Sequence, residues 1–155
     1  MSEKEALVLW LKRLANEQLT DVQFNVYVPA DNILAVIPME VGFQTDRAGW
    51  GKIALSPDGE SLRYSSEDLK KADVGPFGKT EIRRVVNGAD TQRLVGGVVE
   101  GGFLIVEREV PIGLELRLSN GSRFLVLNSG DQMAIRINED HPLLREPGIV
   151  REMVL

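Results

Sequence analysis

The sequence predicts a mainly antiparallel β protein of the α+β class, in which an N-terminal helix packs on a meander-type sheet that forms a sandwich or an open barrel. Three observations support this prediction. One helical segment opens the chain, apolar segments of strand length follow at regular intervals, and turn residues separate these segments. About eight to ten short strands with this spacing are typical of antiparallel pairing and not of βαβ units. The 155 residues are expected to form a single domain, residues 1–155.

The N-terminal helix is predicted by its cap and by the spacing of its apolar residues. Ser2 and Glu5 form a capping-box pattern. The apolar residues that recur at helical spacing are Leu7, Trp10, Leu11 and Leu14. Leu9 widens the apolar surface beyond this stripe, so two interpretations stay open: a helix packed deeply across the sheet, or a helix that binds a partner.

Two strands are predicted directly after the helix. Residues 21–31 read DVQFNVYVPAD, and their apolar and polar side chains alternate as in a half-buried strand. Residues 33–45 form the second strand, in which Pro38 favours an edge position or a bulge. A loop at residues 46–51 follows, with Trp50 between two glycines.

The middle of the chain is predicted to hold a hairpin and further strands. Residues 52–65 contain Pro57-Asp58-Gly59, a strong turn signal between two strand-like ends. Residues 65–73 are predicted to form one short helical turn that begins at a serine cap. The further strand candidates are residues 80–86, 94–99 and 102–110.

The clearest hairpin lies within residues 114–137. Leucines alternate with charged residues up to Asn120-Gly121, the preferred pair for a type I′ turn. Asp131 closes a second turn, which it is expected to cap through its own backbone, and another strand follows. Residues 149–155 are the last strand candidate.

Charge and composition narrow the classes of partner. The formal net charge is −5 and the sequence pI is about 5.0, while lysines and arginines occur in isolated pairs. Phosphate backbones require clustered basic residues, so nucleic acid is not expected as a partner, and a basic protein is favoured instead. The sequence shows no secretory signal, no membrane span and no cysteine, so we expect a soluble cytoplasmic protein.

The sequence contains no motif that predicts catalysis or metal binding. His141 is the only histidine, and Glu139 and Asp140 directly precede it, so the three are expected to lie in an exposed loop without converging on a metal ion. Residues 75–80, GPFGKT, lack the first glycine of a phosphate loop, because Asp73 stands at that position. We therefore expect no catalytic residue, no metal, no cofactor and no enzymatic activity.

Six residues are predicted to contact a partner. Four of them are glutamates in or between adjacent strand candidates, namely Glu100, Glu107, Glu109 and Glu115. They are expected to face solvent and to give the sheet an acidic face for a basic partner; the alternative is a pair facing across a cleft, as in a glycosidase. Trp50 and Tyr64 are candidate anchors, because both residue types are enriched at binding hot spots. Trp50 is equally suited to close the end of a core.

Residues 120–137, NGSRFLVLNSGDQMAIRI, resemble a pattern in small bacterial immunity proteins of polymorphic and contact-dependent growth-inhibition toxin systems. The shared features are a glycine turn, an apolar return strand, and a second turn before another strand. The resemblance implies a cytosolic inhibitor that binds a toxin domain, often a nuclease, and blocks its active site or a nearby surface.

These observations predict a non-catalytic binding protein, an immunity-type inhibitor that neutralises a basic bacterial toxin domain through an acidic surface. Two other classes stay open. One is a secretion chaperone or adaptor, which an acidic composition and an apolar helix also suit. The other is a small-molecule-binding β-barrel, which requires an internal pocket with convergent polar groups.

Overall fold

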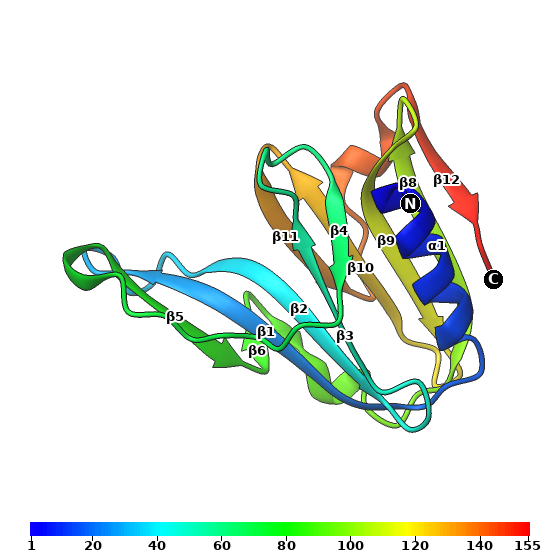
Figure 1. Cartoon of the computed structure of the whole chain (residues 1–155), viewed down its shortest axis with the longest axis horizontal. Helices are drawn as coiled ribbons and strands as arrows, with labels where there is room; N and C mark the ends of the chain where they lie inside the picture. The colour runs from blue at the N-terminus through cyan, green and yellow to red at the C-terminus, as the bar shows by residue number, and fades with distance from the viewer.

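The computed structural model describes residues 1–155 and shows two five-stranded antiparallel sheets that face each other, with one α-helix beside them (Figure 1). The predicted class, α+β with mainly antiparallel strands and an N-terminal helix, is confirmed. Each sheet keeps two free edges, so the architecture is a sandwich and not a barrel. One core of 27 buried residues draws on both sheets and on the helix.

The first sheet has the strand order β4-β3-β2-β1-β5. Its strands are β1 (Leu19–Pro29), β2 (Ile37–Thr45), β3 (Trp50–Leu55), β4 (Leu62–Ser65) and β5 (Gly78–Arg83). The alternating apolar residues of β1 are all buried: Val22, Phe24, Val26 and Val28. The predicted irregularity at Pro38 is a bulge, because Asn25 pairs with Glu40 while the next residue of β1 pairs with Pro38.

An arm, formed by residues 27–38 and 74–80, projects beyond the rest of the sandwich (Figure 1). It consists of the ends of β1 and β2 with the start of β5 and the 3-10 helix η1 (Gly75–Phe77). At its tip, Ile33, Leu34 and Phe77 are 69%, 88% and 73% exposed. The Tyr27 hydroxyl donates a hydrogen bond to the Phe77 carbonyl oxygen at 2.5 Å and so joins two segments of the arm.

The second sheet has the strand order β11-β10-β9-β8-β12. Its strands are β8 (Val99–Glu107), β9 (Val110–Leu118), β10 (Arg123–Ser129), β11 (Gln132–Ile137) and β12 (Ile149–Met153). Outside both sheets lie the small hairpin of β6 (Val85–Val86) and β7 (Ala89–Asp90) and the 3-10 helices η2 (Thr91–Arg93) and η3 (Pro142–Arg145). The predicted pairing of the strands on either side of residues 120–121 and 129–131 is confirmed, as is a terminal strand.

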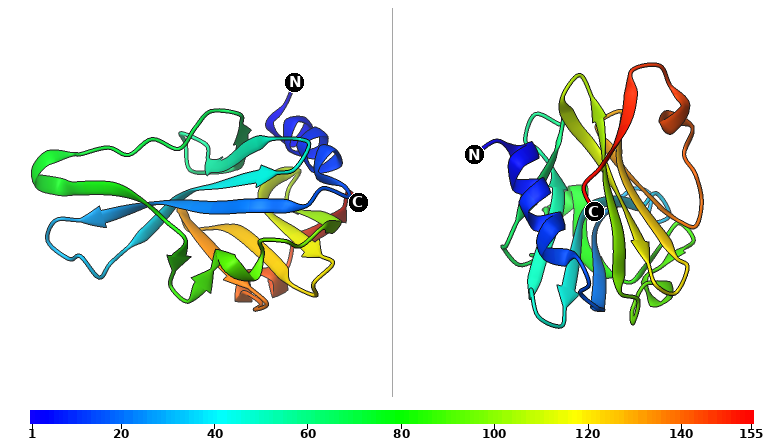
Figure 2. Two further views of the ribbon diagram at one scale, coloured as in Figure 1. Left: turned by 90° about the horizontal axis from the view of Figure 1, so that it is seen from below. Right: turned by 90° about the vertical axis from the view of Figure 1, so that its right-hand side faces the viewer.

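Helix α1 (Glu3–Leu14) begins at the predicted cap, since Ser2 Oγ accepts a hydrogen bond from the Glu5 N–H at 3.1 Å. The helix lies beside β4 and packs against β8 and β9, so it covers a part of the second sheet next to the first (Figure 2). All four residues of the predicted apolar stripe are buried, whereas Leu9 is 48% exposed. No helix has the length and apolar character needed to cross a membrane.

Several local predictions are wrong. The predicted strand at residues 33–45 begins only at Ile37, and Trp50 begins β3 instead of lying in the loop before it. Residues 65–73 contain no helical turn, because the segment runs irregularly along the outer face of the first sheet. Residues 94–97 form a turn after η2, and the strand begins only at Val99. The Asn120-Gly121 turn is not of type I′, because only Gly121 has a positive φ, 86°. The loop has the form of a type I turn followed by a left-handed glycine.

Candidate partner-binding surface

Trp50 has a structural role on the outer face of the first sheet. Its ring packs over Gly42, where a Cβ atom would overlap the ring. Its indole N–H donates a hydrogen bond to the Glu67 carbonyl oxygen at 2.9 Å. Glu67 belongs to residues 66–74, here called the strap, which cross this face. Trp50 is half-buried, and its hydrogen bond holds the strap on the sheet.

Two more side chains of the first sheet bind the strap. Lys52 Nζ donates to the Asp68 carbonyl oxygen at 3.4 Å. Asn25 Nδ2 donates to the Lys70 carbonyl oxygen at 3.2 Å. The strap therefore satisfies part of its backbone with side chains of β1 and β3, although it has no regular secondary structure.

Tyr64 is also engaged within the fold. Its ring stacks on Trp10 of α1, with a centroid distance of 5.3 Å and an interplanar angle of 23°. Its hydroxyl accepts a hydrogen bond from Arg13 at 3.2 Å. Tyr64 therefore ties β4 to the helix while keeping part of its surface exposed.

The prediction that Glu115 faces solvent is wrong, because its side chain is completely buried. Glu115 lies on β9, on the face of the second sheet that points away from the core. Arg117, Arg123 and Arg151 each place a guanidinium nitrogen 3.5 Å from one of its carboxylate oxygens. These arginine side chains cover the carboxylate and make its surroundings basic.

The other three glutamates are exposed, but they do not share one face of the sheet. Glu100 lies in a bulge at the start of β8. Glu107 and Glu109 lie at the other end of this strand, where it turns into β9. Glu109 forms an ion pair with Lys4 of α1 at 3.0 Å. Only this end of the second sheet therefore carries two of the predicted acidic residues.

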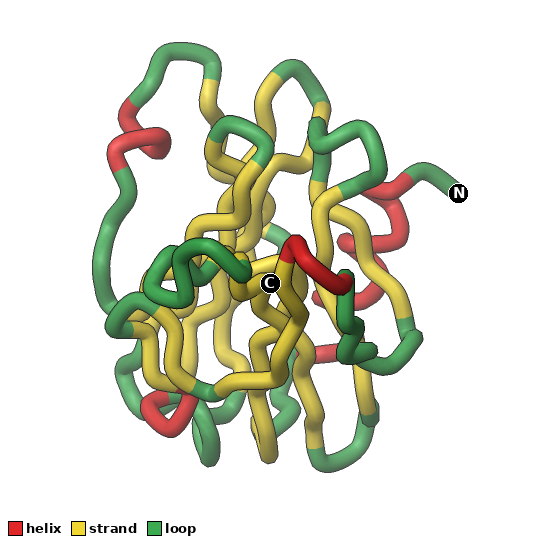
Figure 3. The backbone as a smooth tube through the Cα atoms, turned by 90° about the vertical axis from the view of Figure 1, so that its left-hand side faces the viewer, coloured by secondary structure: helices red, strands yellow, loops and turns green.

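Turns from both sheets bring further carboxylates to the end of the sandwich where β8 turns into β9. Asn128 Nδ2 donates to the Gly59 carbonyl oxygen at 2.6 Å and joins β10 to the β3–β4 turn. Ser61 Oγ donates to the Glu3 carboxylate at 2.6 Å and joins the same turn to α1. Figure 3 shows the turns at this end from the side of the arm. The exposed carboxylates of this acidic end are Asp58, Glu60, Glu107, Glu109 and Asp131.

A cleft of about 670 Å³ lies between the acidic end and the arm. Its walls come from the start of β2, the β3–β4 turn and the β10–β11 turn. Its apolar lining consists of Ile37, Met39, Ala54, Leu55 and Met133, with Pro38 and Pro57 beside them. Asp58 and Asp131 line it at the acidic end, and Arg63 is a cation in its wall that has no ion pair.

The charge of the cleft favours a basic ligand group. Asp58 accepts hydrogen bonds from the Ser56 hydroxyl and from the Glu60 N–H, and these bonds hold the pKa of Asp58 below its usual range. Asp58 is therefore charged at neutral pH. Glu40 is balanced by Lys52, whose Nζ lies 2.7 Å from its carboxylate.

The structure contains no group of three or more His, Asp or Glu side chains arranged to hold a metal ion. His141 caps η3, where its Nδ1 accepts a hydrogen bond from the Leu143 N–H at 3.1 Å. The cleft thus offers carboxylates, one free guanidinium group and an apolar lining, a combination that suits binding.

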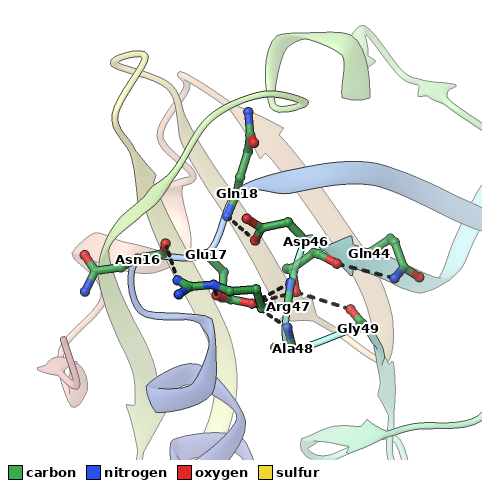
Figure 4. Close-up of polar contacts among 9 residues, drawn as sticks. Asn16, Glu17, Gln18, Gln44, Asp46, Arg47, Ala48 and Gly49 are labelled. Carbon is green, nitrogen blue, oxygen red and sulfur yellow. Dashed lines mark hydrogen bonds and ion pairs between the residues drawn. The ribbon is translucent and has the colours of Figure 1, made fainter.

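A buried polar network at the end of the first sheet opposite the arm is structural (Figure 4). Glu17 is 4% exposed and accepts hydrogen bonds from Thr45 Oγ1 at 3.3 Å and from Arg47 N–H and Nε at 3.0 and 2.8 Å. The Ala48 N–H donates to it as well. These donors fix the β2–β3 loop and surround the carboxylate, so it is not available to a ligand.

Comparisons with protein-family models, with curated proteins and with solved structures return no match. Function must therefore be inferred from the side chains. The sequence identified Asp58 and Asp131 only as turn residues. Their role as neighbours in one cleft depends on the meeting of turns from two sheets, which no local sequence pattern encodes.

Proposed function

We propose that this protein is a non-catalytic protein-binding module and, more specifically, an immunity-type inhibitor that binds a basic toxin domain. The acidic end and the cleft form the proposed contact surface. One observation carries the proposal: exposed carboxylates and apolar side chains lie side by side in a concave surface. Apolar contact supplies affinity in such a surface, and charge supplies orientation and a fast encounter.

A basic side chain of the partner suits this surface. The aliphatic part of a lysine or arginine would lie against Met39, which is 47% exposed, while its charged group reaches Asp58 or Asp131. Opposite charges over the whole contact surface would also accelerate association. Inhibition would be steric, because the arm projects beside the cleft and would cover part of the bound domain.

The arm supports a second candidate, a secretion chaperone or adaptor. Ile33, Leu34 and Phe77 expose apolar surface at a projecting tip. Exposed apolar residues of this kind are suited to bind an apolar segment of another protein. A client bound in this way would depend on Leu34 and Phe77, whereas a toxin bound in the cleft would depend on Asp58 and Asp131.

The partner is identified first, by affinity capture from the native host with the whole chain as bait, followed by mass spectrometry. The binding kinetics of the isolated pair are then measured for wild type and for a charge variant. The charge variant combines Asp58→Asn, Glu60→Gln and Asp131→Asn. Asparagine suits position 131, because Asp131 has a φ of 65° and asparagine tolerates this left-handed conformation.

A control variant removes three exposed carboxylates outside the acidic end, by Glu67→Gln, Asp68→Asn and Glu100→Gln. Each variant changes the net charge from −5 to −2 by the loss of three negative charges. We expect the charge variant to associate about tenfold more slowly than the control variant at low salt.

Raising the ionic strength from about 0.05 to 0.5 M shortens the screening length from roughly 14 to 4 Å and should remove this difference in association rate. Equal association rates for the two variants at low salt would contradict the proposed contact surface. Capture of an acidic partner would contradict the proposed mechanism.

A further inference from the structure

The face of the second sheet that points away from the core carries a second cavity, of about 330 Å³. It lies between the sheet and the segment that contains η3. Three arginines from three separate elements line it: Arg123 of β10, Arg145 of η3 and Arg151 of β12. This basic cavity is distinct from the acidic cleft, with which it shares no lining residue.

The buried Glu115 carboxylate lies next to this cavity and orients two of its arginines. Arg123 Nε and Arg151 Nη2 both lie 3.5 Å from Glu115 Oε1. Full-strength ion pairs between guanidinium and carboxylate groups have distances of about 2.7–2.9 Å. Glu115 Oε2 has no hydrogen-bond partner at all. Glu115 therefore holds the guanidinium groups in place without saturating their N–H donors.

The arginines of the cavity keep donors free. Arg123 Nη2 donates to Asp140 at 2.7 Å, whereas the exposed Arg145 forms no ion pair or hydrogen bond. Arg151 is packed beside the Phe103 ring, with 5.9 Å between its guanidinium carbon and the ring centroid. Arg117 also lies beside Glu115, so four arginines stand against the three carboxylates Glu115, Asp140 and the nearby Glu146, which leaves one positive charge unbalanced.

The remaining lining is suited to a small carbon group. Ile105, Leu144 and Ile149 form the apolar part of the cavity. His141 completes the lining, and because its Nδ1 already accepts the Leu143 N–H, its neutral tautomer carries the proton on Nε2 as a donor. The volume falls at the lower end of the range typical of small-molecule sites, about 300–1,000 Å³.

We propose that this cavity binds the phosphate group of a small phosphomonoester. A tetrahedral phosphate presents several oxygens in different directions and so matches guanidinium groups that approach from β10, η3 and β12. A planar carboxylate has two oxygens and fits such an arrangement less well. The apolar part of the ligand lies against Ile105, Leu144 and Ile149. This assignment is independent of the proposed contact with a toxin domain.

Isothermal titration calorimetry of the whole chain tests the proposal with three probes: phenyl phosphate, inorganic phosphate and benzoate. Phenyl phosphate and benzoate share the ring and differ in the anionic group, whereas inorganic phosphate lacks the ring. We expect phenyl phosphate to bind about tenfold more tightly than either of the other two probes.

Arg145→Gln is the test variant, because the exposed Arg145 side chain forms no hydrogen bond or ion pair, and Arg63→Gln is its matched control. Arg63 is likewise exposed and unpaired, but it lies on the first sheet. Arg145→Gln should weaken phenyl phosphate binding about tenfold, and Arg63→Gln should leave it unchanged. Thermal unfolding of both variants checks that the fold is retained.

Three results would overturn the assignment: no binding of phenyl phosphate at millimolar concentration, equal affinity for benzoate, or unchanged affinity in Arg145→Gln. Equal affinity for inorganic and phenyl phosphate would show that free phosphate is the ligand and would reject a phosphomonoester.

Discussion

The contact between Gly42 and Trp50 depends on the absence of a side chain at position 42. A Cβ atom there would overlap the Trp50 ring, so Gly42→Ala forces the ring away from the sheet or shifts the strand. We expect a loss of about 1–3 kcal/mol in the free energy of unfolding, measured by denaturant titration with tryptophan fluorescence. Gly101→Ala is the control, since its Cβ atom would meet Arg117 at an ordinary 3.5 Å. An equal loss in both variants would refute this explanation.

Glu17→Ala is expected to destabilise the protein more than Arg47→Ala. Loss of the Glu17 carboxylate leaves the N–H groups of Arg47 and Ala48 without their acceptor and leaves the Thr45 hydroxyl only the Gly49 carbonyl oxygen at 3.4 Å, at a cost of about 2–4 kcal/mol. The Arg47 side chain is 70% exposed, so its removal should cost about 1 kcal/mol or less. Denaturant titration of both variants measures the difference, and a larger loss in Arg47→Ala would contradict it.

At the scale of single residues, the sequence identified residue types but not their surroundings. Strand alternation correctly places Glu115 on the face opposite the core, and such faces are usually solvated. Its burial depends on Arg123 from β10 and Arg151 from β12, which are brought to it only by the pairing of strands in the sheet. Glycine at position 42 likewise gave no sign that the Trp50 ring would occupy the space above it.

The attachment of the strap to the first sheet can be tested by removing the side chain of Asn25, which bonds to the middle of the strap. Asn25→Ala removes the hydrogen bond to the Lys70 carbonyl oxygen, so this part of the strap should detach more often. Loss of about 1 kcal/mol in local stability corresponds to about fivefold faster cleavage by trypsin after Lys70 and Lys71. Gln23→Ala is the control, because Gln23 bonds only to Asp21 of the same strand. An unchanged cleavage rate in Asn25→Ala would contradict this prediction and would show that Trp50 and Lys52 hold the strap on the sheet without Asn25.

Elements with local signals were predicted well, and elements held by distant side chains were not. Helix α1 was predicted because its cap and its apolar period lie within the same residues. The serines before the strap were mistaken for a helix cap, because the strap's actual partners, Trp50, Lys52 and Asn25, are far from it in the sequence. The cleft was missed for the same reason, since three turns from two sheets meet there.

For the whole molecule, stability should fall on acidification in two steps. Burial and the positive charge of Arg136 lower the pKa of His141 below its ordinary 6.5, so the folded state favours the neutral imidazole. The stability that neutral His141 gives the folded state is complete above pH 6.5 and is lost as the pH falls below this value. Hydrogen bonds from Arg84 lower the pKa of Asp21 below its ordinary 3.8, so the folded state favours the carboxylate. That contribution is lost as the pH falls below 3.8.

Urea titrations at a series of pH values measure this dependence. His141→Gln should remove the step that begins near pH 6.5, and Asp21→Asn should reduce the step below pH 3.8. Lys70→Gln serves as a control and should leave both steps unchanged, because the Lys70 side chain is exposed and forms no ion pair. A rise in stability on acidification from pH 7 to 5 would contradict the assigned directions.

The position of α1 against both sheets also determines when, during folding, the helix can make its native contacts. The helix is translated before either sheet, yet Lys4 pairs with Glu109, 105 residues later, and the helix packs against β8 and β9. A 12-residue helix on its own is only marginally stable in water. The first sheet supplies partners for Trp10, but the rest of the apolar stripe lacks its native contacts until the second sheet is synthesised, and such distant contacts slow folding. The helix thus leaves the ribosome before the second sheet, but it reaches its full native contacts only after that sheet is present.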